Sequence, residues 1–120
     1  MDLLNDLNQK IKELNLSIKE LRNTGTKYAE AERDYKITLR QEALKLRAEK
    51  GMAITLIQQV VYGIQEVAEK RFQRDVAEAI FTANKEAIQS IKLQIRVIEN
   101  QINREFGAEG KQLWKKYGKI

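Results

Sequence analysis

The feature that most constrains this chain is a heptad stripe close to its first residue. Apolar side chains recur at alternating intervals of three and four residues, at Leu4, Leu7, Ile11, Leu14, Ile18 and Leu21. This spacing is typical of a helix with a narrow apolar seam. A strand would need strict alternation of apolar and polar residues, which this segment lacks. The stripe therefore predicts a helix that needs a partner helix.

Glycine sets the helix boundaries, because the chain contains no proline and only six glycines. We expect residues 2–50 to be largely helical, with a break or kink near Gly25. Asn, Thr and Gly favour turns there, and glycine costs about 1 kcal/mol inside a helix. Gly51 is expected to end the segment.

A short helix over 54–62 is predicted to follow Gly51 and to end at Gly63. Thr55 and Gln58 have the spacing of a capping box, in which Thr55 is the N-cap. This apolar connector admits two interpretations: a recognition surface, since loops on rigid scaffolds often carry recognition, or a plug that covers the end of the helices.

Residues 64–106 keep a helical apolar period without a breaker, so we expect one long helix there. The predicted fold is all-α: an elongated antiparallel helical hairpin with a short connecting helix, forming one domain over 1–106. Two helices bury little apolar surface, so self-association into a coiled-coil-like bundle, a homodimer or larger, is expected. The predicted helix-seam and oligomer residues are Leu7, Ile11, Leu14, Ile18, Leu21, Ile91, Ile95, Ile98 and Ile102.

The composition leaves few groups for catalysis. The chain has no cysteine and no histidine, which removes the usual ligands of zinc, haem and iron–sulfur centres and the base of Ser-His and Cys-His systems. The carboxylates Glu66, Glu69, Asp75 and Glu78 are interleaved with basic residues, a pattern typical of an exposed helix face. We therefore expect no enzyme activity, no catalytic residue, no metal site and no cofactor.

The basic C-terminal segment, residues 107–120, carries most of the net charge of +5. Its four lysines accompany two aromatic residues, so the candidate contacts to a nucleic acid or a partner protein are Lys111, Trp114, Lys115, Lys116, Tyr117 and Lys119. The aromatic rings could stack on bases while the lysines neutralise phosphate. The alternative is that Trp114 folds back and packs against the helices.

Several stretches resemble a group of small, mostly uncharacterised proteins of phages and prophages of Gram-positive bacteria. Together they span about residues 45–107 and comprise 45–57, Gly63, 67–68, 71–72, 74–79, 92–96, Glu99, 101–102 and 104–106. In that group Ala53 is often proline and Phe106 often tryptophan, and both are compatible with the same helix ends. The resemblance implies a phage setting and the cytoplasm of the host cell, and it carries over no catalytic residue.

These observations favour a non-enzymatic phage-type protein of DNA metabolism that binds a replication or recombination protein, or its DNA. One alternative is a counter-defence inhibitor, of the anti-CRISPR or anti-restriction type, that binds a host nuclease. A third is a structural coiled-coil protein of the virion. No apolar run is long enough to cross a membrane, so no membrane partner is expected.

Overall fold

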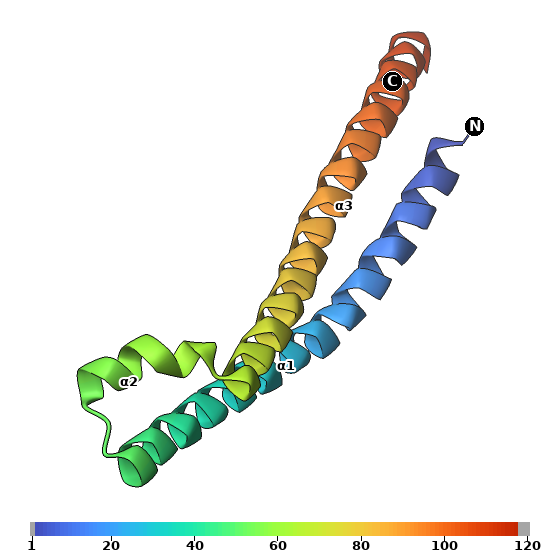
Figure 1. The fold of residues 1–120 in the computed structure, drawn as a ribbon. Helices are drawn as coiled ribbons and strands as arrows, with labels where there is room; N and C mark the ends of the chain where they lie inside the picture. The colour runs from blue at the N-terminus through green and yellow to red at the C-terminus, as the bar shows by residue number, and fades with distance from the viewer. Residues whose placement is uncertain (1, 118–120) are drawn as a thin grey trace. The chain divides into compact units, whose positions relative to one another are not determined.

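The computed structural model describes the backbone of residues 2–117 and the side chains of residues 2–107, and it is all-helical over that range. Figure 1 shows the order of the elements: α1 (Leu3–Lys50), α2 (Ile54–Val60), the 3₁₀ turn η1 (Val61–Gly63) and α3 (Gln65–Tyr117). The short helix and the long second helix predicted from the sequence are thus present. The all-α class is confirmed.

These elements form two compact units. The central unit is Glu20–Asn84, and it holds the second part of α1, all of α2 and η1, and the start of α3. The terminal unit combines the described parts of Met1–Lys19 and Lys85–Ile120. Each unit pairs a segment of α1 with a segment of α3.

The core of the central unit lies where α2 and η1 pack on the two long helices. Its buried members are Tyr35, Ile57, Val61 and Val67, and Val67 is fully buried. Partly buried side chains complete the cluster: Leu39, Ala43, Leu46, Met52 and Ile64. Figure 1 shows α2 as the short helix that joins the end of α1 to the start of α3. The short helix therefore supplies inward-facing residues to this core.

The break expected near Gly25 is absent, because residues 23–26 lie inside α1. Contacts with α3 hold this stretch in place. The Oγ1 of Thr24 donates a hydrogen bond to Oδ1 of Asn84 at 2.8 Å. The ring of Phe81 occupies the space beside Gly25, where an added Cβ would lie 3.1 Å from it. Tertiary contacts here outweigh the local preference for a turn.

Two other predicted boundaries are shifted. The N-cap of α2 is Ala53 and makes no side-chain cap hydrogen bond, so the capping box from Thr55 to Gln58 is wrong. The backbone N–H groups of Leu56 and Ile57 bond instead to the carbonyl oxygen of Ala53. The helix predicted to end at 106 continues to Tyr117. An isolated glycine such as Gly107 costs too little to stop a long helix.

The terminal unit packs one side of the predicted stripe. Leu7 and Leu14 are partly buried, whereas Ile11 and Ile18 are 40% and 46% exposed. Lys10 and Ser17, each one residue earlier, are the partly buried positions instead. Ile91, Ile95, Ile98 and Ile102 of α3 are all partly buried. Leu21 is partly buried in the central unit. The involvement of these nine residues in an oligomer stays a prediction.

Candidate protein-binding surface

The connector between α1 and α3 is held in a defined position by its first turn. Gly51 has a φ of 58°, a conformation that glycine adopts without steric cost. Its N–H bonds to the carbonyl oxygen of Arg47 at 3.1 Å, the pattern of a left-handed C-cap. The Nη1 of Arg47 then donates to the carbonyl oxygen of Met52 at 3.1 Å. The turn is thus tied to the helix that it leaves.

The inner side of the connector anchors it to the central unit. Ile57 and Val61 are four residues apart, so they lie on one side of the helical turns, and both are buried. They join Tyr35 and Val67 in the core. At about 25 cal/mol per Å² of buried apolar area, each such side chain contributes roughly 1.5–3 kcal/mol. Burial of this inner side fixes which residues the connector presents to solvent.

Four large apolar side chains of the connector are exposed, next to the exposed polar residues Thr55, Gln58 and Gln59. Ile54, Leu56, Val60 and Tyr62 are exposed by 61%, 45%, 38% and 46%. No aspartate, glutamate, lysine or arginine occurs in residues 51–65. We call these four residues the α2 surface. Neighbouring exposed apolar side chains without charge are typical of the centre of a protein–protein interface.

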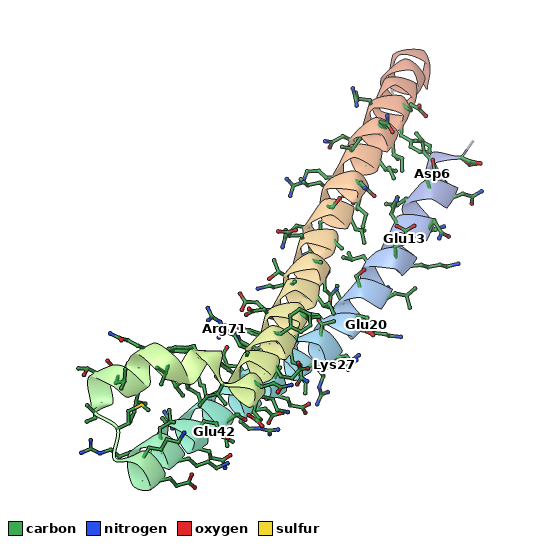
Figure 2. The ribbon with its side chains drawn as sticks, in the orientation of Figure 1. Asp6, Glu13, Glu20, Lys27, Glu42 and Arg71 are labelled. Carbon is green, nitrogen blue, oxygen red and sulfur yellow. The ribbon has the colours of Figure 1, made fainter. Side chains whose placement is uncertain are left out.

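Arginine side chains of α3 border the connector and the core. The guanidinium of Arg71 lies 5.8 Å from the ring centroid of Tyr62. Figure 2 labels Arg71 on α3 and Glu42 on α1, the two helices that the connector joins. A cation over an aromatic ring contributes about 0.5–1 kcal/mol at an exposed site. Arg71 thus supports the position of Tyr62 at the edge of the α2 surface.

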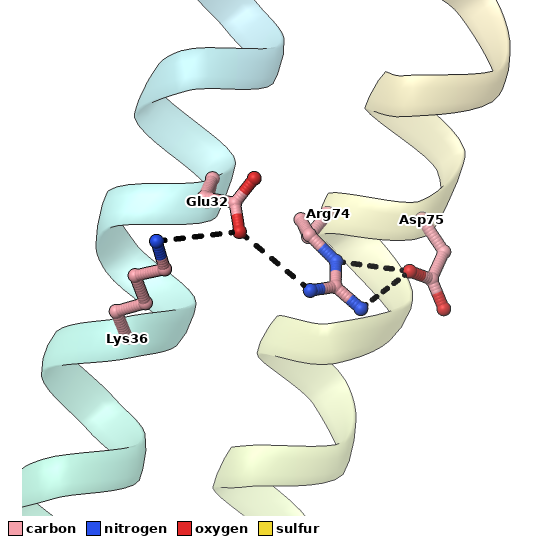
Figure 3. Close-up of polar contacts among 4 residues, drawn as sticks. All are labelled: Glu32, Lys36, Arg74 and Asp75. Carbon is pink, nitrogen blue, oxygen red and sulfur yellow. Dashed lines mark hydrogen bonds and ion pairs between the residues drawn. The ribbon is translucent and has the colours of Figure 1, made fainter.

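A polar cluster joins α1 to α3 in the central unit. Figure 3 shows Arg74 reaching Glu32 across the two helices, at 3.7 Å, and Asp75 on its own helix, at 2.9 Å. Glu32 also pairs with Lys36 at 3.7 Å, in the favourable i,i+4 order. The guanidinium of Arg74 lies 4.6 Å from the ring centroid of Tyr35. The hydrogen bond to Asp75 raises the pKa of Arg74, so this guanidinium keeps its charge.

The phenol of Tyr28 belongs to the same cluster. Its ring stacks on Phe81 of α3, with the centroids 5.9 Å apart. A hydrogen bond to Glu32 is the main cause that raises the pKa of Tyr28 to about 12, and burial and the charges of Glu32 and Glu78 add to it. Tyr28 is therefore neutral at physiological pH. The cluster holds the pairing of the two helices, and nothing in its geometry indicates catalysis.

The carboxylates considered as metal ligands do not gather. Asp75 pairs with Arg74, and Glu69 accepts a hydrogen bond from Nε2 of Gln73 at 3.2 Å. Within residues 2–107, no group of three or more aspartates and glutamates is arranged to hold a metal ion. The candidate contacts of the basic segment lie outside the described side chains: Lys111, Trp114, Lys115, Lys116, Tyr117 and Lys119.

Sequence reasoning identified the connector but missed the contacts that position it. Tyr35 continues the register of the N-terminal stripe at a distance of two heptads from Leu21, and that spacing could have indicated its burial. Nothing local marks Arg74 or Asn84 as the residue that meets α1, because the α1 residues that they contact are 39 or more residues away.

In the part of the chain that the structure describes, no helix is long and apolar enough to cross a membrane. In comparisons with known proteins, no family model, no curated protein and no solved structure matches this chain. A role is therefore assigned from the fold and the α2 surface.

Proposed function

We propose that this chain is a non-enzymatic interaction protein that binds a partner protein through the α2 surface. The observation that carries the proposal is the exposure of four large apolar side chains in a connector without charged residues: Ile54, Leu56, Val60 and Tyr62. Leaving such residues in water forgoes roughly 1.5–3 kcal/mol per large apolar side chain. A partner that covers them recovers this free energy.

The partner class rests on the sequence. Resemblance to small phage and prophage proteins and the basic C-terminal segment favour a replication or recombination protein.

The antiparallel hairpin and its self-association belong to the same proposal. The antiparallel pairing is supported in the central unit, where the contacts of Thr24 with Asn84 and of Tyr35 with Arg74 follow opposite chain directions.

The test is affinity capture from host lysate, with and without the phage proteins, followed by mass spectrometry. Leu56→Lys places a charge in the middle of the α2 surface, so we expect it to lose the specific partner. Leu16→Lys is the matched control, because Leu16 is 66% exposed and belongs to the terminal unit. Retention of the same proteins by Leu56→Lys would contradict the proposal.

The identity of the captured protein separates the functions still open. A replication or recombination protein supports a role in DNA metabolism. A host nuclease supports a counter-defence inhibitor, which would occlude the nuclease with a helical surface. Recovery of the chain from purified virions supports a structural role.

A second candidate function, direct DNA binding, is favoured by the four lysines around Trp114 and Tyr117. Gel shifts at rising salt test it. The logarithm of the binding constant should fall with the logarithm of the salt concentration, with a slope of about −0.7 for each phosphate neutralised on single strands or −0.9 on duplex DNA. Deletion of residues 108–120 should abolish the gel shift.

If Trp114 packs against the helices instead, Trp114→Ala should lower the melting temperature, because loss of a buried Trp costs about 3–5 kcal/mol.

A further inference from the structure

An apolar groove lies between α1 and α3 of the central unit, on residues that the α2 surface does not use. It has a volume of about 240 Å³, and its α3 side is formed by Phe72, Val76, Ala77 and Ile80. Phe72, Val76 and Ile80 are 65%, 42% and 54% exposed. At intervals of four residues they form one ridge along the helix. We call these three side chains the α3 ridge.

The two ends of the α3 ridge carry opposite charges. Lys27 of α1 lines the groove, and the stacking of Tyr28 on Phe81 places it beside the Ile80 end. No ion pair of Lys27 occurs among the described contacts of this unit. Glu69 lies three residues before Phe72, at the other end, where its described partner is the neutral amide of Gln73. The α3 ridge is therefore apolar, with Lys27 beside its Ile80 end and Glu69, bonded to the lining residue Gln73, beside its Phe72 end.

We infer that a second copy of this chain docks on the α3 ridge, antiparallel to the first and related to it by a two-fold axis at Val76. In this arrangement Phe72 of each copy meets Ile80 of the other, and the two Val76 side chains meet at the axis. Interdigitating i±4 ridges are the commonest way in which helices of globular proteins pack. The contact is self-complementary, as a two-fold interface requires.

Charge complementarity selects the antiparallel order. The two-fold axis brings Lys27 of each copy to the end of the groove where Glu69 of the other copy lies, so two opposite-charge pairs form. A parallel order would place Lys27 beside Lys27 and Glu69 beside Glu69. Like charges across an interface oppose association, whereas complementary charges fix its register.

The contact area determines the strength of the association. A fully covered aromatic side chain buries about 150–250 Å², and Val76 and Ile80 are smaller, so the three partly exposed side chains offer at most roughly 300 Å² per copy. A stable dimer buries about 800 Å² per partner. The ridge alone therefore supports a weak dimer that exchanges with monomer, and its formation depends on protein concentration.

Sedimentation equilibrium over a wide range of protein concentration tests the dimer. Val76→Asp places two carboxylates at the axis and should raise the dissociation constant at least tenfold. Leu44→Asp is the control, because Leu44 is 67% exposed and does not line the groove, and it should leave the constant unchanged. A purely monomeric chain would overturn the inference, as would a dimer that Val76→Asp does not weaken.

A charge swap tests the antiparallel order. Lys27→Glu should weaken the dimer about threefold to tenfold, and Lys27→Glu combined with Glu69→Lys should restore it. Failure of the double variant to recover would exclude the proposed register. Circular dichroism confirms that each variant is folded.

Cysteine cross-linking gives a second measurement, since the chain has no cysteine of its own. Val76→Cys should form a disulfide-linked dimer on mild oxidation, and Leu44→Cys should not. Equal cross-linking of both variants would contradict the two-fold axis at Val76. Leu56→Lys on the α2 surface should not change dimerisation, so failure of the dimer and failure of the proposed partner are distinguishable.

Discussion

The central and terminal units pair the same two helices in different ways. In the central unit, polar and aromatic contacts join α1 to α3 beside the apolar core: Thr24 with Asn84, Tyr28 with Phe81, and Arg74 with both Glu32 and Tyr35. In the terminal unit, the partly buried positions of α3 are isoleucines at heptad spacing, Ile91, Ile95, Ile98 and Ile102.

Directional contacts specify which residues meet, because a displaced polar partner would leave a buried group unsatisfied. Aliphatic heptads are less selective, since each apolar position fits several holes of similar size. The comparison indicates that the central unit sets the register of the two helices. The terminal unit adds apolar burial through the isoleucines of α3.

The largest effect is expected from a charge in the core of the central unit. Val67 is fully buried, so Val67→Asp should lower the free energy of unfolding by about 4 kcal/mol or more. Val97→Asp, in the terminal unit, is the control, since Val97 is 56% exposed and the change should stay within about 0.5 kcal/mol. Urea denaturation followed by circular dichroism measures both. Similar losses for the two variants would contradict the burial of Val67 in the core of the central unit.

A smaller loss is expected when the Thr24–Asn84 hydrogen bond is removed. Thr24→Val keeps the shape of the side chain but leaves Asn84 without this donor, which should cost about 1–3 kcal/mol. Thr26→Val is the matched control on the same helix, because Thr26 is exposed and its hydroxyl bonds only to the Arg22 carbonyl oxygen. The difference between the denaturation midpoints of the two variants measures how much the Thr24–Asn84 hydrogen bond contributes to stability. Equal midpoints would show that this hydrogen bond does not help to fix the pairing.

Gly25→Ala should show a conflict between propensity and packing. Alanine gains about 1 kcal/mol of helix propensity over glycine, but its Cβ would lie 3.1 Å from Phe81, which is itself stacked on Tyr28. We expect Gly25→Ala to lower the free energy of unfolding by between zero and about 1 kcal/mol. Gly107→Ala, with nothing within 4 Å of the added Cβ, should instead stabilise α3. Thermal melts compare the two, and a gain of equal size at Gly25 would contradict close packing there.

The smallest effect concerns alkaline pH. The pKa of Tyr28 is raised to about 12 from an ordinary value of 10.0. Between these values the unfolded chain has released the phenol proton while the folded chain retains it, so stability falls as pH rises through this window. Tyr28→Phe lacks this proton and keeps the aromatic ring. Melting temperatures from pH 8 to 11.5 should therefore converge for the two proteins, and a constant difference would show that the phenol is not held by Glu32.

Local sequence determined the helices, because helix formation depends on residues within one or two turns of each other. The long apolar period without proline predicted α3, and the glycine at 51 predicted the end of α1. The apolar connector was also evident from sequence, although Ala53 rather than Thr55 is the N-cap of its helix.

Only the tertiary structure decided which side of each helix is covered. The heptad stripe contains both Leu14 and Ile18, yet Leu14 is partly buried and Ile18 is 46% exposed. Whether the helix continues through Gly25 depended on Asn84 and Phe81, about 60 residues away. Such contacts depend on how two helices are rotated against each other. Apolar periodicity within one helix marks a broad side and leaves that rotation open.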